Sequence, residues 1–574
     1  MKFALTCITL LATADACSNI LVTPGAATDH SSMIAYNADS ANLYGSLYHY
    51  PAAKNPDHAI RDVYEWDTGK YLGSIPESPT TYNVVGNVNE VGLTIGETTY
   101  GGIESLCSQP GAIIDYGSLI YLTLQRASTA REAVKTMDFL MQEYGYYSEG
   151  ESFSIADKDE VWIMEVIGKG VNQKGSVWVA RKIPDGMVAA HANQARITQF
   201  PKDEPENTLF AKDVISFARA YGLFEGTDDE FSFSDTYDPL TFEGARFCEA
   251  RVWSFYGNLL GQEFQDQFID YASGWNLTNR MPLFITPPAQ LSLSDVFEHM
   301  RNHFEDTDLD FRSDVGAGRY EVPYRHRPLG WSVESEPNKT YVNERAIGTQ
   351  QTGWNYVAQI RPSMPTPLQS LLWFGVDDSA TTVRFPIYGA ARKLPASFAG
   401  KGPQDGVVQP MMNFDLKKAF YVFNLASNWA YQRWSDVYPV MHQKILEIES
   451  ELISKAKTMD ANAMLAFSES QEKGLEMISE FGVKVGDELT ERWMGFFGEP
   501  FVRFRDGYDI TQNLEDSACG CDVGGNGYSK NTYERIVAET GDHYENVGGG
   551  GGEHLTDVKV EHKGKNKLSL RALN

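Results

Sequence analysis

The chain has 574 residues, of which 77 are acidic and 49 basic, and its formal net charge is −28 at pH 7. This excess of negative charge argues against nucleic acids and anionic membranes as partners, because both bind through basic patches. With 42% hydrophobic and 12% aromatic residues, the composition is that of a globular protein with a large core.

The first 16 residues have the pattern of a secretory signal peptide. One positive charge at Lys2 precedes a short apolar run over residues 3–12, and Ala14-Asp15-Ala16 places small residues where a signal peptidase reads. We therefore expect residues 1–16 to be removed, so that Cys17 becomes the first residue. The protein is then expected to be secreted or lumenal (extracellular, periplasmic or lysosome-like, depending on the source). No later stretch is apolar over the ~20 residues that a spanning helix needs, so no membrane span is expected.

Strand patterns dominate the first part of the remaining chain, and helix patterns dominate the end. Runs of β-forming residues predict strands over residues 18–22, 33–38, 92–96, 152–156, 161–166 and 176–180. Residues 119–144 have helical spacing, and Ser128 or Thr129 with Glu132 resembles a capping box for the second half of that stretch. A helix-rich stretch runs from about residue 436 to 493. Five glycines at 548–552 and a polar stretch at 554–574 predict a flexible linker and a disordered tail.

The mature chain would keep an odd number of cysteines, which leaves at least one unpaired unless an intermolecular bond forms. They are Cys17, Cys107, Cys248, Cys519 and Cys521. Cys17 is the candidate for the free thiol. Cys519 and Cys521 are separated by one residue, which we take to be too close for a mutual disulfide. Each of them is free to pair with Cys107 or Cys248 instead, and the sequence does not fix the connectivity.

When a cysteine is the first residue of a chain, its own α-amino group can act as the base. A thiol attacks as its thiolate, and an ordinary cysteine with a pKa of about 8.5 is mostly protonated at neutral pH. A free α-amino group has a pKa of about 7.7–8.0, so it can accept the thiol proton without a catalytic histidine. Removal of the leader would then be the activation step. Two other interpretations of Cys17 are a lipoprotein anchor and a plain structural cysteine. The leader lacks the usual Leu three residues before the cysteine, which fits an anchor poorly.

Blocks of sequence that begin at Cys17 resemble the dipeptidase A and secernin family of cysteine-dependent N-terminal nucleophile hydrolases. The blocks follow one another in order from residue 17 to about residue 510, whereas residues 515–574 match nothing in the family. We therefore assign residues 17–514 to the hydrolase domain and 515–574 to the glycine-rich linker and tail. The blocks include Cys17-Ser18-Asn19, Tyr36-Asn37-Ala38-Asp39, Gly96-Glu97-Thr98-Thr99, His191-Ala192-Asn193-Gln194, Ala250-Arg251-Val252-Trp253 and Gly375-Val376-Asp377-Asp378.

The resemblance implies an α+β fold, the four-layer αββα sandwich, with a helix-rich C-terminal portion and no metal or organic cofactor. It implies Cys17 as the nucleophile and Asp39 as the residue that orients the thiol and the amine. Asn193 would offer an amide N–H to the oxyanion, Thr98 would lie in the substrate pocket, and Arg251 would lie near the nucleophile. Tyr36 stands where penicillin V acylase and bile-salt hydrolase carry Arg.

Each assigned side chain also has a structural interpretation. Asp39 and Asn193 could belong to ordinary turns, where these residue types are common, and Arg251 could form a structural ion pair. Three functions follow from the sequence. The first is a dipeptidase acting on small peptides through an acyl-enzyme. The second is an amidase of the penicillin V acylase and bile-salt hydrolase type. The third is a non-catalytic secreted or lipid-anchored binding protein on the same fold. A homo-oligomer is compatible with each of them.

Overall fold

The structure is a computed structural model that describes residues 17–41, 43–107, 109–171, 173–402, 412–515, 519–525 and 527–546. The predicted signal peptide at 1–16 and the glycine run at 548–552 lie outside the described residues. The chain divides into two compact units, residues 1–497 and 498–574. Each unit is described by itself.

A seven-stranded antiparallel sheet begins directly after Cys17. Its strand order is β16-β14-β1-β2-β19-β20-β21. The strands are β1 (Ser18–Val22), β2 (Ser32–Asp39), β14 (Val188–His191), β16 (Phe284–Ile285), β19 (Thr352–Ile360), β20 (Ser370–Val376) and β21 (Phe385–Tyr388). The strands β1 and β2 are central and buried along their whole length. The residue before β1 is therefore held near the middle of the sheet.

An eight-stranded sheet packs against the first one. Its order is β15-β13-β12-β11-β10-β9-β8-β3. Asn19 in β1 donates from Nδ2 to the carbonyl oxygen of Glu97 at 2.7 Å, and Tyr356 donates to the carbonyl oxygen of Ile95 at 3.3 Å. A Cβ on Gly96 would lie 2.9 Å from the Tyr356 hydroxyl, so this close approach requires glycine. The strands are β3 (His49–Tyr50), β8 (Val84–Val85), β9 (Val88–Asn89), β10 (Thr94–Gly101), β11 (Gly150–Ala156), β12 (Val161–Gly168), β13 (Ser176–Lys182) and β15 (Thr208–Phe210).

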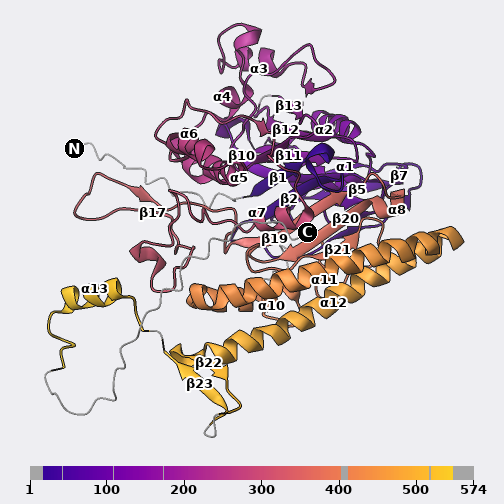
Figure 1. Cartoon of the computed structure of the whole chain (residues 1–574). Coiled ribbons are helices and arrows are strands. Elements are labelled where there is room, and N and C mark those ends of the chain that lie inside the picture. Colours follow the sequence, from indigo (N-terminus) through magenta and orange to yellow (C-terminus); the bar gives the residue numbers. More distant parts are fainter. Residues whose placement is uncertain are drawn as a thin grey trace. The chain divides into compact units, whose positions relative to one another are not determined.

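Helices contact both sheets. α1 packs on β10 and α2 on β11, β12 and β13, whereas α5 packs on β14, α10 on β20 and α11 on β21. In Figure 1 the long orange helices α11 and α12 run side by side, and Arg492 of α12 forms an ion pair with Glu451 of α11 at 2.7 Å. The helices of this unit are α1 (Tyr116–Leu124), α2 (Ala130–Tyr144), α3 (Val214–Ala220), α4 (Phe233–Tyr237), α5 (Ala250–Leu260), α6 (Gln262–Ala272), α7 (Leu293–His299), α8 (Thr366–Gln369), α10 (Ala419–Gln432), α11 (Trp434–Glu469) and α12 (Gln471–Arg503), whose last residues extend beyond it.

Three two-stranded sheets complete the first unit. Their strands are β4 (Ala53–Lys54) with β7 (Thr80–Thr81), β5 (Ile60–Tyr64) with β6 (Tyr71–Pro76), and β17 (Gly330–Trp331) with β18 (Tyr341–Val342). The architecture agrees with the predicted class of mixed helices and strands. The predicted helix over 119–144 is two helices, α1 and α2, and Thr129 caps the second by accepting from the Glu132 backbone N–H. The helix-rich portion begins at Ala419 rather than near residue 436.

The second unit corrects part of the prediction for residues 515–574. It contains a hairpin of β22 (Asp509–Gln512) with β23 (Cys521–Gly524) and the helix α13 (Lys530–Thr540), which Ser529 caps. The described part of the predicted linker and tail therefore holds regular structure.

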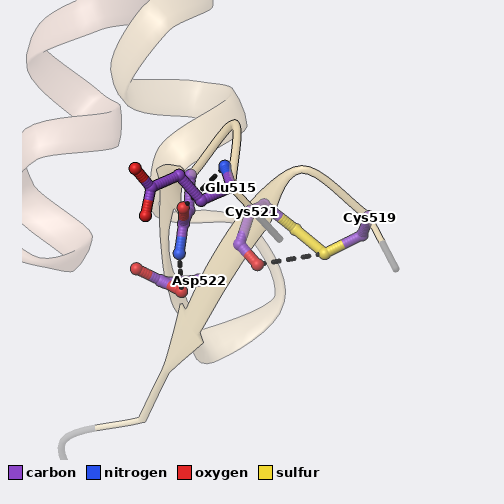
Figure 2. Close-up of a disulfide and its surroundings, with 5 residues drawn as sticks. Glu515, Cys519, Cys521 and Asp522 are labelled. Carbon is purple, nitrogen blue, oxygen red and sulfur yellow. Dashed lines mark hydrogen bonds between the residues drawn. A yellow bond between two sulfur atoms is a disulfide. The ribbon is translucent and has the colours of Figure 1, made fainter. Parts of the chain in front are cut away.

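The cysteine pairing differs from the prediction as well. Cys519 and Cys521 form a disulfide with each other (Figure 2), and Cys107 and Cys248 are free thiols, as is Cys17. Gly520 adopts a φ of +68°, which lets the chain turn sharply and brings the two cysteine Cα atoms to 5.3 Å. That separation lies in the range that a disulfide spans. A separation of one residue therefore does not prevent this disulfide.

Candidate active site

Cys17 lies directly before β1, with 3% of its surface exposed. Its Sγ lies 3.4 Å from the hydroxyl oxygen of Tyr36 in β2 and 3.9 Å from Oε1 of Glu97 in β10. The Tyr36 hydroxyl also donates a hydrogen bond to Glu97. The nucleophile candidate is thus enclosed between the two large sheets.

The surroundings of Cys17 favour the neutral thiol. Burial raises its pKa well above the ordinary value, and the negative charges of Glu97 and Asp39 raise it further. The hydrogen bond between the sulfur and the Tyr36 hydroxyl and the one from the Asp39 backbone N–H act in the opposite direction. A thiol in this position needs a base and a nearby positive charge before it can attack as a thiolate.

Arg251 is the cation that the structure brings to this cysteine. It lies in the first turn of α5 and is 1% exposed. Its Nη1 donates to the carbonyl oxygen of Cys17 at 2.6 Å and to Ser18 Oγ at 2.8 Å, and Nη2 donates to Asn193 Oδ1 at 2.7 Å. These bonds hold the backbone of Cys17 and the segment after β14 in one arrangement, and they place Arg251 next to the nucleophile candidate.

Asp39 ends β2 and lies next to Cys17, since its backbone N–H donates to the sulfur. Thr352 donates to its Oδ1 at 2.6 Å, whereas its buried Oδ2 has no hydrogen-bond partner among the described residues. Burial raises the Asp39 pKa to about 7, against the lowering effects of Thr352, Arg251 and Arg345. A buried carboxylate oxygen without a donor is costly, so this atom is suited to receive one.

Asn193 follows the end of β14, and Thr98 in β10 lies close to the same segment. Asn193 donates from Nδ2 to the carbonyl oxygen of Thr99 at 2.6 Å, so both ends of its side-chain amide are engaged. Thr98 donates to the Ala192 carbonyl oxygen at 2.7 Å and contacts His191 Nδ1 at 2.7 Å. His191 also bonds Ser154 through Nε2, and burial lowers its pKa to about 3. This histidine is therefore neutral and occupied at both nitrogens, and it is a poor candidate for a general base.

A pocket of about 520 Å³, including its open mouth, adjoins the cysteine through Tyr36 and Glu97. Thr98 does not line it, although the sequence places Thr98 in the substrate pocket; its neighbour Glu97 does. The lining residues are Tyr36, Ser46, Tyr48, Tyr50, Trp66, Gly86, Asn87, Glu97, Tyr116, Gly117, Ile120, Tyr121, Trp354 and Phe374.

Comparison with known proteins settles the family. The model of the family described as "Peptidase family C69" matches residues 16–446, and this match begins one residue before Cys17. The chain belongs to peptidase family C69. This confirms the resemblance found in the sequence, and it makes the protein a cysteine-type peptidase.

Relatives of this C69 peptidase carry consistent names. This chain is 25% identical over 394 residues to a "Probable dipeptidase" of Salmonella dublin, and the aligned region covers 66% of this chain and 82% of that protein. It is 26% identical over 381 residues to a "Probable dipeptidase" of Latilactobacillus sakei, covering 63% and 71%. It is 22% identical over 475 residues to "Dipeptidase A" of Lactobacillus helveticus, covering 78% and 90%.

Sequence reasoning left out several residues of the C69 peptidase site. Glu97 was part of a matching block and directly follows the strand predicted over residues 92–96, and an acidic residue that is buried is a signal of a special role. Glu151, Thr352 and Arg345 come from distant segments and gave no comparable signal. Arg345 is buried near Asp39 and Arg251, and burial together with the Arg251 charge lowers its pKa to about 10.

The described residues lack two features that are typical of other classes of protein. They contain no group of three or more His, Cys, Asp or Glu side chains arranged to hold a metal ion. Within the same residues, no helix has the length and apolar character needed to cross a bilayer.

The raised pKa of Asp39 predicts a pH-dependent effect on stability. In a chain that keeps residues 1–16, Asp39 ionises at about pH 7 when folded and near 3.8 when unfolded. The folded state therefore holds an extra proton between these values, and stability falls as pH rises through this window. We expect the stability of Asp39→Asn relative to the parent chain to increase by about 3 kcal/mol between pH 4 and pH 8.

Urea unfolding at several pH values measures this difference. The matched substitution Asp57→Asn removes an exposed carboxylate and should show no such trend. A constant difference between Asp39→Asn and the parent across the range would mean that Asp39 ionises alike in both states.

Proposed function

We propose that this C69 peptidase is a dipeptidase that uses Cys17 as an N-terminal nucleophile. The observation that carries the proposal is the enclosure of Cys17 by Arg251, Asp39 and Tyr36 beside a pocket lined mostly by aromatic side chains. The names of the relatives support dipeptides as the substrate class. The antiparallel sheets that pack face to face, with helices contacting each of them, support the four-layer αββα sandwich of N-terminal nucleophile hydrolases.

Cleavage before Cys17 would expose an α-amine and create the base. The amine takes the thiol proton, and the sulfur attacks the carbonyl carbon of the first residue of the dipeptide. The proton then passes to the leaving nitrogen, which departs as the amino group of the second residue, and a thioester remains on Cys17. Water, deprotonated by the same amine, attacks the thioester and releases the first residue. Each cycle consumes one water and restores the thiol and the amine.

Asp39 is suited to hold the new amine. Its Oδ2 has no donor among the described residues, and an ammonium beside this atom would satisfy it and favour the ionised carboxylate. Asn193 has its side-chain amide bound by Arg251 and Thr99, so the oxyanion role falls to its backbone N–H. One such donor contributes about 2.7–4 kcal/mol to the transition state. The signal pattern in residues 1–16 supports cleavage before Cys17 and a secreted or lumenal location.

The direct test combines two measurements on one preparation. Mass spectrometry should find a mature chain that begins at an unmodified Cys17, and that chain should hydrolyse members of a mixed dipeptide panel. Aromatic acyl amides belong in the same panel, because the aromatic pocket also suits an amidase. Turnover of those amides with no dipeptide hydrolysis would overturn the dipeptidase assignment. A lipidated Cys17, or an N-terminus elsewhere, would overturn the mechanism.

A further inference from the structure

The pocket beside Cys17 combines aromatic rings with negative charge. Among its lining residues, Tyr50 and Tyr121 stack with ring centroids 4.4 Å apart, and Trp66 meets Tyr48 edge-on at 4.9 Å. Glu97 is its one acidic residue, and no Lys, Arg or His lines it. Aromatic faces and carboxylates both attract cations, and the pocket offers no fixed cation of its own.

A second buried carboxyl group, that of Glu151, contacts Glu97. Glu151 lies in β11 opposite Thr99, two residues from Glu97, and Thr99 donates to its Oε1 at 2.8 Å. Glu151 is fully buried, and burial together with Glu97 raises its pKa well above the ordinary value. Two acids in contact favour one shared proton, so the pair carries about one negative charge. A cation arriving at Glu97 would be balanced by that charge.

The distance between Glu97 and the sulfur matches the shape of a dipeptide. A thiolate in position to attack lies about 3–3.5 Å from the carbonyl carbon. The α-nitrogen of the same residue is only two bonds from that carbon. Because Oε1 of Glu97 lies 3.9 Å from Cys17 Sγ, an ammonium on that α-carbon can reach the carboxylate while the carbonyl faces the sulfur.

We propose that Glu97 is a specificity-determining residue that binds the α-ammonium group of the substrate, with the side chain of the first residue in the aromatic pocket. The proposal rests on the proposed function and narrows its substrate class to peptides with a free, protonated N-terminus. Dipeptides with an aromatic or large apolar first residue are the best substrates, and compounds that lack the amine are poor ones.

Binding of the ammonium also affects the nucleophile. The negative charge of Glu97 is one of the causes that hold the thiol in its neutral form. A substrate cation at Glu97 cancels that charge next to the sulfur and so favours the thiolate. Tyr36 stands where related acylases carry Arg, and the substrate itself supplies the positive charge on this side of Cys17.

The test compares two substrates that differ only in the amine, phenylalanyl-alanine and 3-phenylpropionyl-alanine. We expect the wild-type enzyme to prefer the first by about 10- to 100-fold in kcat/KM, which is the range of a charge-assisted hydrogen bond. The ratio should fall as pH rises past about 8, where the α-amine of the substrate loses its proton. Titrations of the enzyme affect both substrates and cancel in the ratio.

Glu97→Gln removes the charge at nearly constant volume. It should bring the ratio near one, chiefly by weakening kcat/KM for phenylalanyl-alanine. The control is Glu149→Gln, the same change at an exposed carboxylate nearby, which should keep the wild-type ratio. If Glu97→Gln does not fold, the wild-type ratio of kcat/KM for the two substrates and its pH dependence still test whether the enzyme selects the substrate ammonium group.

Cys17→Ser separates this inference from the proposed function. Loss of all hydrolysis in Cys17→Ser, with a wild-type ratio near one, would overturn the role of Glu97 and leave the cysteine mechanism intact. Hydrolysis that survives in Cys17→Ser would overturn the mechanism itself. A preference for 6-aminohexanoyl-alanine over phenylalanyl-alanine would overturn the α-ammonium assignment, because the favoured cation would then be on the side chain.

Discussion

Replacing Cys17 with serine should lower kcat/KM for dipeptides by about 10⁴-fold or more, the loss seen when a nucleophile is removed from a coupled catalytic group. A serine hydroxyl is a much weaker acid than a thiol and a weaker nucleophile, so the same α-amine activates it far less in a site shaped for sulfur. The side chains are similar in size, and Cys17 contributes no disulfide. The loss should therefore appear in turnover, with the fold preserved.

The matched control is Cys107→Ser. Cys107 is also a free thiol, and its Sγ donates to the carbonyl oxygen of Gly101 at 3.4 Å, an interaction that a serine hydroxyl can keep. This variant should retain wild-type activity. Activity in Cys17→Ser comparable to that of Cys107→Ser would assign the nucleophile to another residue, and circular dichroism of both variants shows whether folding is responsible for a loss.

The strands around the nucleophile could be predicted because their signal is local. Residues 18–22 were predicted as a strand and form β1 with the same bounds, and the strand predicted over 33–38 lies within β2. Asp39 and Arg251 were assigned from family blocks, and both interact with Cys17. A family block indicates where its residues lie in the whole fold, whereas a short run of residues predicts only its own secondary structure.

The errors arose where a role depends on contacts across the fold. Thr98 and Glu97 are neighbours in β10, and only the packing of the sheets decides that Glu97 borders the pocket whereas Thr98 bonds the Ala192 carbonyl. Glu151 joins the site through its pairing with β10. The Cys519–Cys521 bond depends on the backbone conformation of Gly520. None of these features follows from residue type and spacing alone.

A chain that keeps one residue ahead of Cys17 should be inactive. Two preparations test this: a leader cut by a site-specific protease immediately before Cys17, and the same leader cut one residue earlier so that a single alanine remains. We expect a difference of at least about 10²-fold in kcat/KM, the lower range for loss of a general base. An amide nitrogen cannot accept the thiol proton, and burial holds the Cys17 pKa well above its ordinary value.

The pair is closely matched, because both chains share every residue from Cys17 onward. Removal of the extra alanine by an aminopeptidase should restore activity, which excludes misfolding as the cause of the loss. Equal activity in both chains would show that the α-amine is not the base. The proton would then have to leave through a group that contacts the sulfur, and the Glu97 carboxylate, whose Oε1 lies 3.9 Å from Sγ, is a candidate to receive it. The experiment thus decides whether the base comes from the backbone of Cys17 or from the wall of the pocket.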